Sequence, residues 1–288
     1  MFFNWFKTII LLTALMTLVG GIAYFYNGTA GLISAVIITF FVQGLTYFFS
    51  DRIVLRMYNA QPLTQAQYPD IYAMVQELTQ IMRIPMPSLF IINSNVANAF
   101  ATGRNPSHAS VAVTQGILLI LQPYELRAVL AHELAHIKNR DILVGTIAAM
   151  LASIIGYLAY WLRSSILWGQ HKKEKNSNPV VIILLTILVP FVATLIQLAI
   201  SRSREYLADE SGALCCKDPL ALASALEKLH NHVPYAHFDA DETHKASTAH
   251  LFIVYPFLNN NFLSWFSTHP PMSARIKRLR ALYEKQLH

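Results

Sequence analysis

The sequence predicts a mainly α-helical α+β protein, anchored in a membrane by about four transmembrane helices and carrying a cytoplasmic domain. Hydrophobic residues make up 54% of the 288 residues and charged residues only 13%, about half the charged share of an average soluble domain. The apolar residues are concentrated in long uncharged segments, and the remainder alternates short helix-like and strand-like stretches. Intrinsic disorder is therefore excluded, and an ordinary cytosolic domain is disfavoured.

Charge and cysteine usage exclude two further classes of protein. The net charge is +6, from 22 basic and 16 acidic residues, but no basic stripe with interleaved aromatic residues is present, so we expect no nucleic-acid partner. The two cysteines, Cys215 and Cys216, are adjacent and cannot join distant parts of a fold. A disulfide-rich secreted scaffold is therefore excluded, and we expect both thiols to pack within a helix.

The first apolar segment, residues 8–50, contains no Lys, Arg, Asp or Glu and is about twice the ~20 residues that cross a bilayer. Asn27 and Gly28 lie near its middle and predict a turn. We therefore expect two spans, at 8–26 and 30–50. The alternative is a cleaved signal peptide, but no small-residue cleavage site precedes Tyr24 and a second span follows at once.

Two later uncharged segments, 142–162 and 180–200, are also long enough to span. Lys7, Arg52 and Arg56 flank the first hairpin on one side, which places the N-terminus and the chain after it in the cytoplasm. If both later segments span, the basic loop 163–179 lies outside the cytoplasm, although Lys and Arg are usually enriched in cytoplasmic loops. The alternative is that these two helices sit only partly in the membrane.

These segments divide the chain into four parts. Residues 1–57 form an N-terminal transmembrane hairpin and residues 142–201 a second one. Residues 58–141 and 202–288 are together long enough for one domain. Because the second hairpin interrupts that domain, we expect its two halves to meet in space.

Periodicity and turn residues predict the elements of the cytoplasmic part. Helices are expected from Pro69 to Pro85, from Pro123 to about Arg140, and from Met272 to about Lys285. A further helix is expected to begin with Ser201 or Ser203 as its cap and to run through Ala213. Strands are expected at 88–92 and 110–114, with a shorter one at 98–103. A polar stretch is expected to be a solvated loop and contains His230, His232, His237, His244 and His250.

Two histidines in the helix after Pro123 form the strongest chemical signal. His132 and His136 are four residues apart, so a helix places both on one face, where they can bind one tetrahedral zinc ion. Glu133 follows the first histidine and can act as general base on a zinc-bound water. A chance match in this composition is expected on the order of 0.01 times. The alternative is a buried histidine pair beside a surface glutamate.

A catalytic zinc also needs a third protein ligand and an open position for water. Glu205 and Asp209 lie past the second hairpin and share a helix face at i, i+4. Glu205 is the preferred ligand, and Asp209 is expected to accept the other ring N–H of a ligating histidine. Asn139 is expected to support the ligands in a similar way. The alternative is that Glu205 and Asp209 are solvated charges paired with Arg202 or Arg204.

Four motifs, in this order, resemble the HtpX-type membrane zinc endopeptidases, gluzincins related to the prenyl-protein (CAAX) proteases. The motifs are Asn-Ala-Phe-Ala-Thr-Gly at 98–103, His-Glu-Leu-Ala-His at 132–136, Ser-Arg-Glu-Tyr-Leu-Ala-Asp-Glu at 203–210 and Thr-His-Pro-Pro at 268–271. The resemblance covers nearly the whole chain, and four ordered motifs make it highly specific.

The resemblance implies a role for each motif. It implies one zinc ion per chain, held by His132, His136 and Glu205, with Glu133 as the catalytic base. It implies that His269 and Arg275 stabilise the oxyanion or position substrate; the alternative is a helix cap and a surface cation. It also implies a substrate-docking edge strand formed by Asn98, Ala99, Phe100, Ala101, Thr102 and Gly103.

Residues and resemblance together predict a zinc-dependent endopeptidase of a bacterial inner membrane, with its active site facing the cytoplasm. The expected partners are the lipid bilayer and polypeptides, and quality control of misfolded or damaged membrane proteins is implied by the resemblance. One alternative is a CAAX-type protease of prenylated substrates, for which the chain has few membrane spans. The other is a non-catalytic membrane scaffold with a structural zinc, which would have no use for Glu133 as a base.

Overall fold

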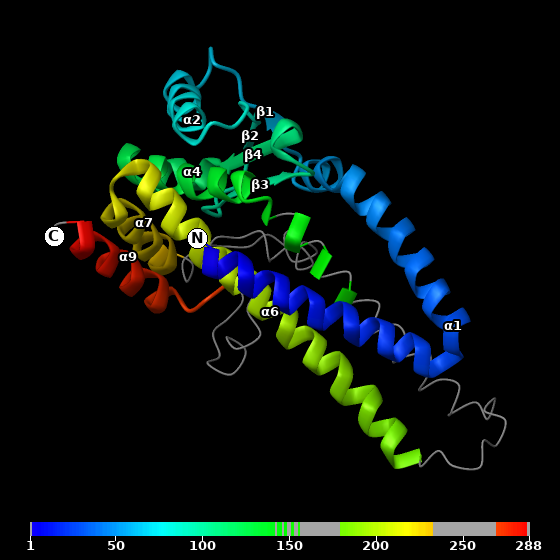
Figure 1. Cartoon of the computed structure of the whole chain (residues 1–288). Helices are drawn as coiled ribbons and strands as arrows, with labels where there is room; N and C mark the ends of the chain where they lie inside the picture. The colour runs from blue at the N-terminus through cyan, green and yellow to red at the C-terminus, as the bar shows by residue number, and fades with distance from the viewer. Residues whose placement is uncertain are drawn as a thin grey trace. The chain divides into compact units, whose positions relative to one another are not determined.

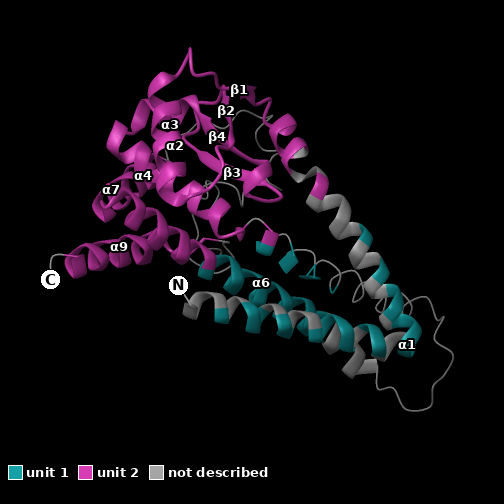
Figure 2. Cartoon of the chain, turned by 45° about the horizontal axis from the view of Figure 1, so that its top comes forward, with its two compact units in different colours: residues 1–46, 144–203 teal, residues 47–143, 204–288 magenta. Residues whose placement is uncertain are grey.

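The computed structural model describes residues 2–141, 143–145, 147–148, 151–152, 155, 179–232 and 269–286. These form two compact units (Figure 2). Unit 1 comprises Met1–Thr46 and Val144–Ser203, and unit 2 comprises Tyr47–Leu143 and Arg204–His288. Residues 163–178 of the basic loop, and the predicted loop histidines at 237, 244 and 250, lie outside the described residues.

Two long helices, α1 (Phe2–Met57) and α6 (Pro179–Cys216), carry three of the four uncharged segments. The helix α1 turns sharply within its length (Figure 1). Gly28, at the predicted turn, has φ of +55°, a left-handed conformation that glycine adopts without steric cost. The two predicted segments 8–26 and 30–50 are therefore the limbs of one bent helix.

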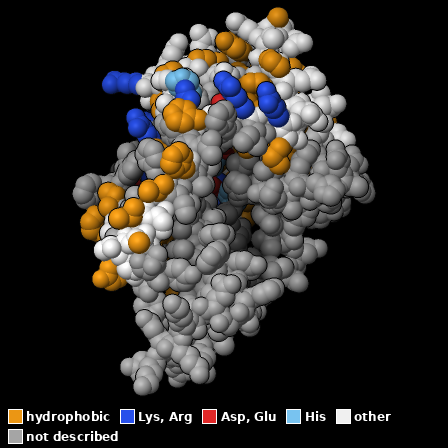
Figure 3. Space-filling view, turned by 90° about the vertical axis from the view of Figure 1, so that its right-hand side faces the viewer, with side chains coloured by type: hydrophobic (Ala, Val, Ile, Leu, Met, Phe, Trp, Pro, Cys, Tyr) orange, Lys and Arg blue, Asp and Glu red, His pale blue; other side chains and the backbone are white. Residues whose placement is uncertain are grey.

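Within the described residues, one helix, Ile187–Cys216, is long and apolar enough to cross a membrane. Apolar side chains, drawn in orange, gather at the left of Figure 3. Exposed apolar surface of this kind marks contact with lipid or another protein. The number of spans stays a prediction. The exposed apolar residues on the two long helices include Phe6, Ile9, Ile10, Tyr24, Ile33, Ile37, Phe41, Ile187, Leu188, Phe191 and Leu195.

Unit 2 contains a four-stranded sheet in the order β1-β2-β4-β3. Its strands are β1 (Gln61–Pro62), β2 (Ser88–Ile92), β3 (Ala99–Gly103) and β4 (Ala109–Thr114). β2 and β4 are parallel, and β3 runs antiparallel to β4 with Ala101 opposite Val111. The three predicted strands are confirmed to within one residue at each end. Among the described strands, β3 lies at the edge of the sheet, while β1 is too short and exposed to be visible in the sequence pattern.

Three predicted helices of unit 2 are confirmed as α2 (Pro69–Met82), α4 (Pro123–Lys138) and α9 (Met272–Gln286). The structure adds the α-helices α3 (Gln115–Ile120) and α7 (Pro219–His232) and a short 3-10 helix, η1 (Pro106–His108). His230 and His232 lie in the last turn of α7, so the prediction that they belong to a loop was wrong. Buried Leu222, Leu226 and Leu229 follow a helical spacing and hold this segment as a helix.

The prediction that a new helix begins at Ser201 or Ser203 was also wrong. α6 runs without interruption from the apolar segment through Ala213 to Cys216. The hydroxyl of Ser203 donates to the backbone oxygen of Ile200 at 2.8 Å. A serine inside a helix satisfies its hydroxyl in this way, by bonding to the preceding turn rather than by capping a new one.

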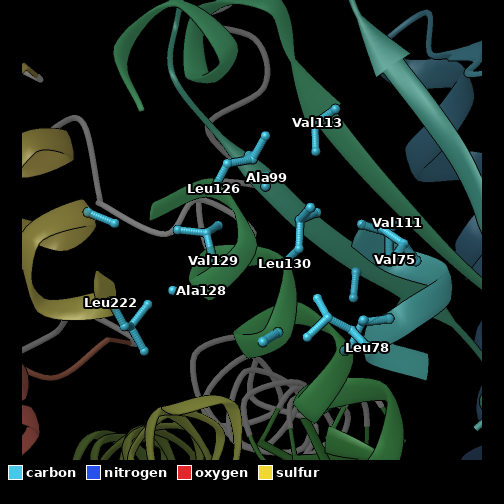
Figure 4. Close-up of a cluster of buried hydrophobic side chains, with 14 of the residues drawn as sticks. Val75, Leu78, Ala99, Val111, Val113, Leu126, Ala128, Val129, Leu130 and Leu222 are labelled. Atoms are coloured by element: carbon cyan, nitrogen blue, oxygen red, sulfur yellow. The ribbon is translucent and has the colours of Figure 1, made fainter. Parts of the chain in front are cut away.

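The helix α4 lies at the centre of the apolar core of unit 2 (Figure 4). Eleven of its 16 residues are buried, and burying one leucine or valine side chain stabilises a fold by about 1.5–3 kcal/mol. This packing fixes the helix that carries the histidine motif. Its partners come from α2, β3, β4 and α7, and the labelled core residues are Val75, Leu78, Ala99, Val111, Val113, Leu126, Ala128, Val129, Leu130 and Leu222.

Candidate metal centre

The two histidines of the motif face each other from successive turns of α4. Pro123 stands in the first turn of this helix, and Gln122 and Glu125 form a reciprocal capping box at its start, which stabilises the N-terminus. The Nε2 atoms of His132 and His136 lie 3.1 Å apart. Both nitrogens are therefore close enough to bind one ion.

Glu205 reaches the same point from α6. In the sequence it follows the uncharged segments 142–162 and 180–200, whereas the two histidines precede them. Its Oε2 lies 3.7 Å from His132 Nε2, and its Oε1 lies 3.6 Å from His136 Nε2. Tetrahedral zinc with bonds of about 2.0–2.1 Å would place its ligand atoms roughly 3.3 Å apart. The three side chains have the residue types and spacing of a gluzincin zinc site, and they are the described residues that could hold a metal ion together.

The opposite ring nitrogens of both histidines contact buried carboxylates. Nδ1 of His132 lies 3.1 Å from Asp209 Oδ1, and Nδ1 of His136 lies 2.8 Å from Asp141 Oδ2. A carboxylate on one nitrogen fixes the proton there and leaves the other nitrogen as the metal ligand. Asp209 thus lies where the sequence predicted it, whereas Asp141 was missed.

The charged groups buried around this point carry a net negative charge that a divalent cation would balance. Among the described residues, four carboxylates, from Glu133, Asp141, Glu205 and Asp209, and two guanidinium groups, from Arg204 and Arg275, are buried at the site. With neutral imidazoles, these groups leave two negative charges. Buried charge is costly unless it is paired, so the donor set and the charge both fit a metal dication such as zinc.

His269 and Arg275 contact the carboxylates rather than open space. His269 Nδ1 and Arg275 Nη1 lie 3.1 and 3.3 Å from Glu205 Oε2. Arg275 also donates to both oxygens of Asp209, at 2.9 and 2.6 Å, and its side chain is fully buried. The alternative of a surface cation is therefore wrong for Arg275. A direct contact of either residue with substrate stays a prediction.

Glu133 lies between the histidines and the edge strand. Its Oε2 accepts a hydrogen bond of 2.9 Å from the backbone N–H of Ala101. Burial is the largest influence on its carboxyl and raises the pKa above the ordinary value, although the imidazoles of His132 and His136 act in the opposite direction. A raised pKa brings a carboxylate closer to the range in which a general base works near neutral pH.

Of the six residues predicted to bind substrate, five form the edge strand β3 and Asn98 directly precedes it. All six are buried. Phe100 packs against Tyr58 with ring centroids 5.5 Å apart, and the backbone of Asn98 bonds to Thr114. These six residues are therefore packed within the protein, and an added strand would meet the backbone of β3. A small pocket lies between the end of β3 and α4, lined by Gly103, Arg104, Asn105, Ala109, His136, Ile137, Arg140 and Leu143.

Sequence reasoning missed three residues that assemble this centre: Asp141, Arg204 and Gly212. Asp141 and Arg204 border the uncharged segments, and opposite charges at both borders were a signal that the two ends meet. Gly212 lies against α4, where a Cβ would come within 2.9 Å of the His132 backbone. Asn139 contributes its backbone oxygen, which accepts from Arg204 at 2.7 Å; within the described residues its side-chain nitrogen has no partner.

Comparison with known proteins shows one family across most of this chain. The sequence profile of peptidase family M48 matches residues 65–283. The chain is 46% identical over 283 residues to a protease HtpX homolog of Thermococcus kodakarensis, covering 98% of this chain and 97% of the relative. It is 46% identical over 281 residues to one of Syntrophobacter fumaroxidans, covering 96% and 99%.

A solved structure shares the fold at lower sequence identity. The crystal structure of Ste24p from S. mikatae superposes with a TM-score of 0.59 and 19% identity. The match covers 97% of this chain and 67% of the Ste24p chain. The architecture described above is therefore one that a solved protein adopts.

Proposed function

The chain belongs to peptidase family M48 and is a metalloprotease, and from this membership we propose that it is a membrane-bound zinc endopeptidase. One zinc ion per chain would be held by His132, His136 and Glu205. The observation that carries the proposal is the convergence of these three side chains, which come from α4 and α6 and lie 69 residues apart in the chain at their nearest. Both histidines turn Nε2 toward Glu205 and Nδ1 toward a carboxylate.

The reaction proposed for this site is hydrolysis of a peptide bond. When bound, zinc supplies a Lewis acid that polarises the scissile carbonyl and acidifies a water molecule. Glu133 takes a proton from the attacking water on a carboxylate oxygen and returns it to the leaving amine. His269 and Arg275 hold the carboxylate of Glu205 in place, and the N–H of Ala101 holds that of Glu133.

Polypeptides are the proposed substrates, bound in an extended form beside β3. An added strand would form main-chain hydrogen bonds to an edge, with Asn98 to Gly103 as the docking segment. Such contacts read little side-chain sequence. That suits the proposed role in quality control of misfolded or damaged membrane proteins.

The proposed location is a bacterial inner membrane, with several spans and the active site facing the cytoplasm. The proposed protease domain combines residues 58–141 and 202–288, interrupted by a transmembrane hairpin at 142–201 and preceded by one at 1–57. The division into two compact units, each built from two stretches of chain, supports this arrangement. The charge bias around the first hairpin supports the orientation.

Metal analysis combined with a protease assay tests the proposed function. The purified chain in detergent should contain about one zinc per chain, cleave casein, lose the activity to a chelator and regain it with added zinc. A prenylated CAAX peptide assayed in parallel should be a poorer substrate, which separates the alternative specificity. A zinc-loaded chain that cleaved neither substrate would instead indicate a scaffold.

A further inference from the structure

Arg204 reaches from α6 to the end of α4, although its own neighbour in the sequence is the proposed third ligand. Its Nε and Nη2 both contact Asp141 Oδ1, and its Nη2 donates to the backbone oxygen of Asn139 at 2.7 Å. Arg204 is only 3% exposed. A long cationic side chain is rarely buried to this extent without a specific partner.

Asp141 uses its other oxygen for the second histidine. Oδ2 of Asp141 lies 2.8 Å from His136 Nδ1, so His136, Asp141 and Arg204 form one continuous chain of contacts. Asp141 is itself 7% exposed. Without a cation beside it, a buried carboxylate would be an uncompensated charge, which strongly destabilises a fold.

The first histidine is supported by a matching set of contacts. His132 contacts Asp209, and Asp209 accepts from Arg275 of α9 at 2.9 and 2.6 Å. Each histidine therefore has one aspartate behind it and one buried arginine behind the aspartate. Arg204 differs from Arg275 in its place in the chain, because it directly precedes Glu205 on α6. It therefore contacts the aspartate that supports His136, the second ligand, and is the sequence neighbour of Glu205, the third.

We propose that Arg204 is a positioning residue that, through Asp141, orients His136 for metal binding and so couples the second and third zinc ligands. The inference rests on the proposed zinc site. By pairing with Asp141, Arg204 balances the charge of the carboxylate and holds it in place. The Nδ1–H of His136 then stays directed at Asp141, and Nε2 faces the metal.

Zinc affinity of the metal-free protein, measured by competition with a chromophoric chelator, tests the proposal without using activity. Arg204→Gln and Asp141→Asn should each weaken zinc binding about 10–100-fold, the usual effect of losing a residue that orients a ligand. The double variant should be about as weak as the weaker single variant, because both changes interrupt the same chain of contacts. Arg204→Lys keeps the charge and should lie closer to the wild type.

Arg280→Gln is the matched control, because Arg280 also pairs with a carboxylate, that of Glu227, but at the surface. Its zinc affinity should equal that of the wild type. The absorption spectrum of bound Co²⁺ reports the ligand geometry and should change in Arg204→Gln but not in Arg280→Gln. If Arg204→Gln does not fold, Asp141→Asn carries the test, because it interrupts the same chain of contacts, and a folded Asp141→Asn protein with wild-type zinc affinity would overturn the inference.

Two results would overturn the inference. One is a folded Arg204→Gln protein whose zinc affinity lies within twofold of the wild type and whose Co²⁺ spectrum is unchanged, even if it unfolds at a lower temperature. The other is strict additivity of the Arg204→Gln and Asp141→Asn losses. A wild-type chain that bound no zinc would contradict the proposed function itself, which keeps the two failures distinguishable.

Discussion

At the scale of single residues, each side chain at the metal centre has a second contact that determines what its reactive atom can do. His132 and His136 direct Nδ1 at Asp209 and Asp141. Glu133 has one oxygen on the N–H of Ala101. These contacts orient each group before metal and substrate arrive, which is the usual condition for efficient general-base catalysis.

Glu133→Gln is expected to leave zinc bound and to abolish turnover. The amide has nearly the same volume and can occupy the same place, but it cannot take a proton from water. General-base catalysis contributes about 10²–10⁴-fold, so casein cleavage should fall by at least that range. Zinc content and the initial rate of casein cleavage are the measurements, and a wild-type rate would show that Glu133 is not the base.

Alanine substitutions on α6 should weaken zinc binding in the order Glu205, Asp209, Glu210. Glu205 is the proposed ligand, and Asp209 contacts His132, so its loss should cost about 10–100-fold in affinity. Glu210 is next in sequence but half-buried on a different side of the helix, and it serves as the control. Chelator competition gives the three affinities, and a larger loss for Glu210 than for Glu205 would mean that the third ligand is assigned wrongly.

At the scale of elements, the centre depends on how closely α6 approaches α4. Gly212 allows this approach, because a Cβ there would lie 2.9 Å from the Cα and backbone nitrogen of His132. The start of α4 is held in another way. Glu125 is fully buried there and accepts from Ser224 and Lys228 of α7 at 2.6 and 2.7 Å.

Gly212→Ala should push the two helices apart and destabilise the fold by about 1–3 kcal/mol, as overpacking typically does. Zinc affinity should fall as well, because the backbone that would be displaced is that of a ligand. The control is Gly145→Ala, where no described atom outside its own helical turn lies within 4 Å of the added Cβ and alanine should be neutral or favourable in a helix. Thermal unfolding in detergent and chelator competition are the measurements, and equal behaviour of the two variants would contradict this view of the contact.

Glu125 should make the stability of unit 2 dependent on pH. Burial by itself raises its pKa, but hydrogen bonds from Lys228, Ser224 and Gln122 outweigh burial and bring the pKa below the ordinary value of 4.5. A carboxyl whose pKa is lowered on folding stabilises the fold above its unfolded pKa, and this contribution is lost as the pH falls through the folded pKa. Glu125→Gln should therefore cost about 1–3 kcal/mol at neutral pH, from partners left unsatisfied.

The test is the difference in unfolding free energy between wild type and Glu125→Gln, measured from pH 7 down to pH 3. The difference should be constant above about pH 4.5 and shrink below it, and taking a difference cancels the titration of the metal centre. Glu77→Gln is the control, because Glu77 forms an exposed pair with Arg127 that should contribute little. A difference that did not change with pH would show that Glu125 acts through packing alone.

At the scale of the whole molecule, the two compact units are each built from two stretches of chain. The metal centre lies entirely in unit 2, but its ligands come from both stretches of that unit. Any membrane insertion between them must return the chain to the same side. The uncharged segments at 142–162 and 180–200 satisfy this requirement if both cross the bilayer.

The loop between those segments, which lies outside the described residues, should therefore face away from the cytoplasm. Single cysteines at Gly169 and Asn176, in a background with Cys215 and Cys216 replaced by alanine, should react with a membrane-impermeant maleimide in intact cells. A cysteine in place of Gln67, in unit 2, should react only after lysis and is the control. Labelling of the loop only after lysis would show that the second hairpin does not cross.

The sequence by itself determined the helix with His132, Glu133 and His136, the strands 88–92 and 110–114, and the placement of Glu205 and Asp209 on one helix face. These features are local: helical spacing, capping residues and apolar periodicity act within a few residues of one another. The continuity of α6 could not be predicted as reliably, because a serine that caps a helix and one that bonds to the preceding turn look the same in a sequence.

Only the tertiary structure decided how the charges of the centre are paired. Asp141 and Arg204 are 63 residues apart in the chain and meet because α6 packs on α4. Arg275 is fully buried although its helix is strongly basic, because it pairs with the carboxylates of Glu205 and Asp209 on α6. Contacts of this kind follow from how surfaces fit together, and a one-dimensional pattern carries no record of which distant partner will be there.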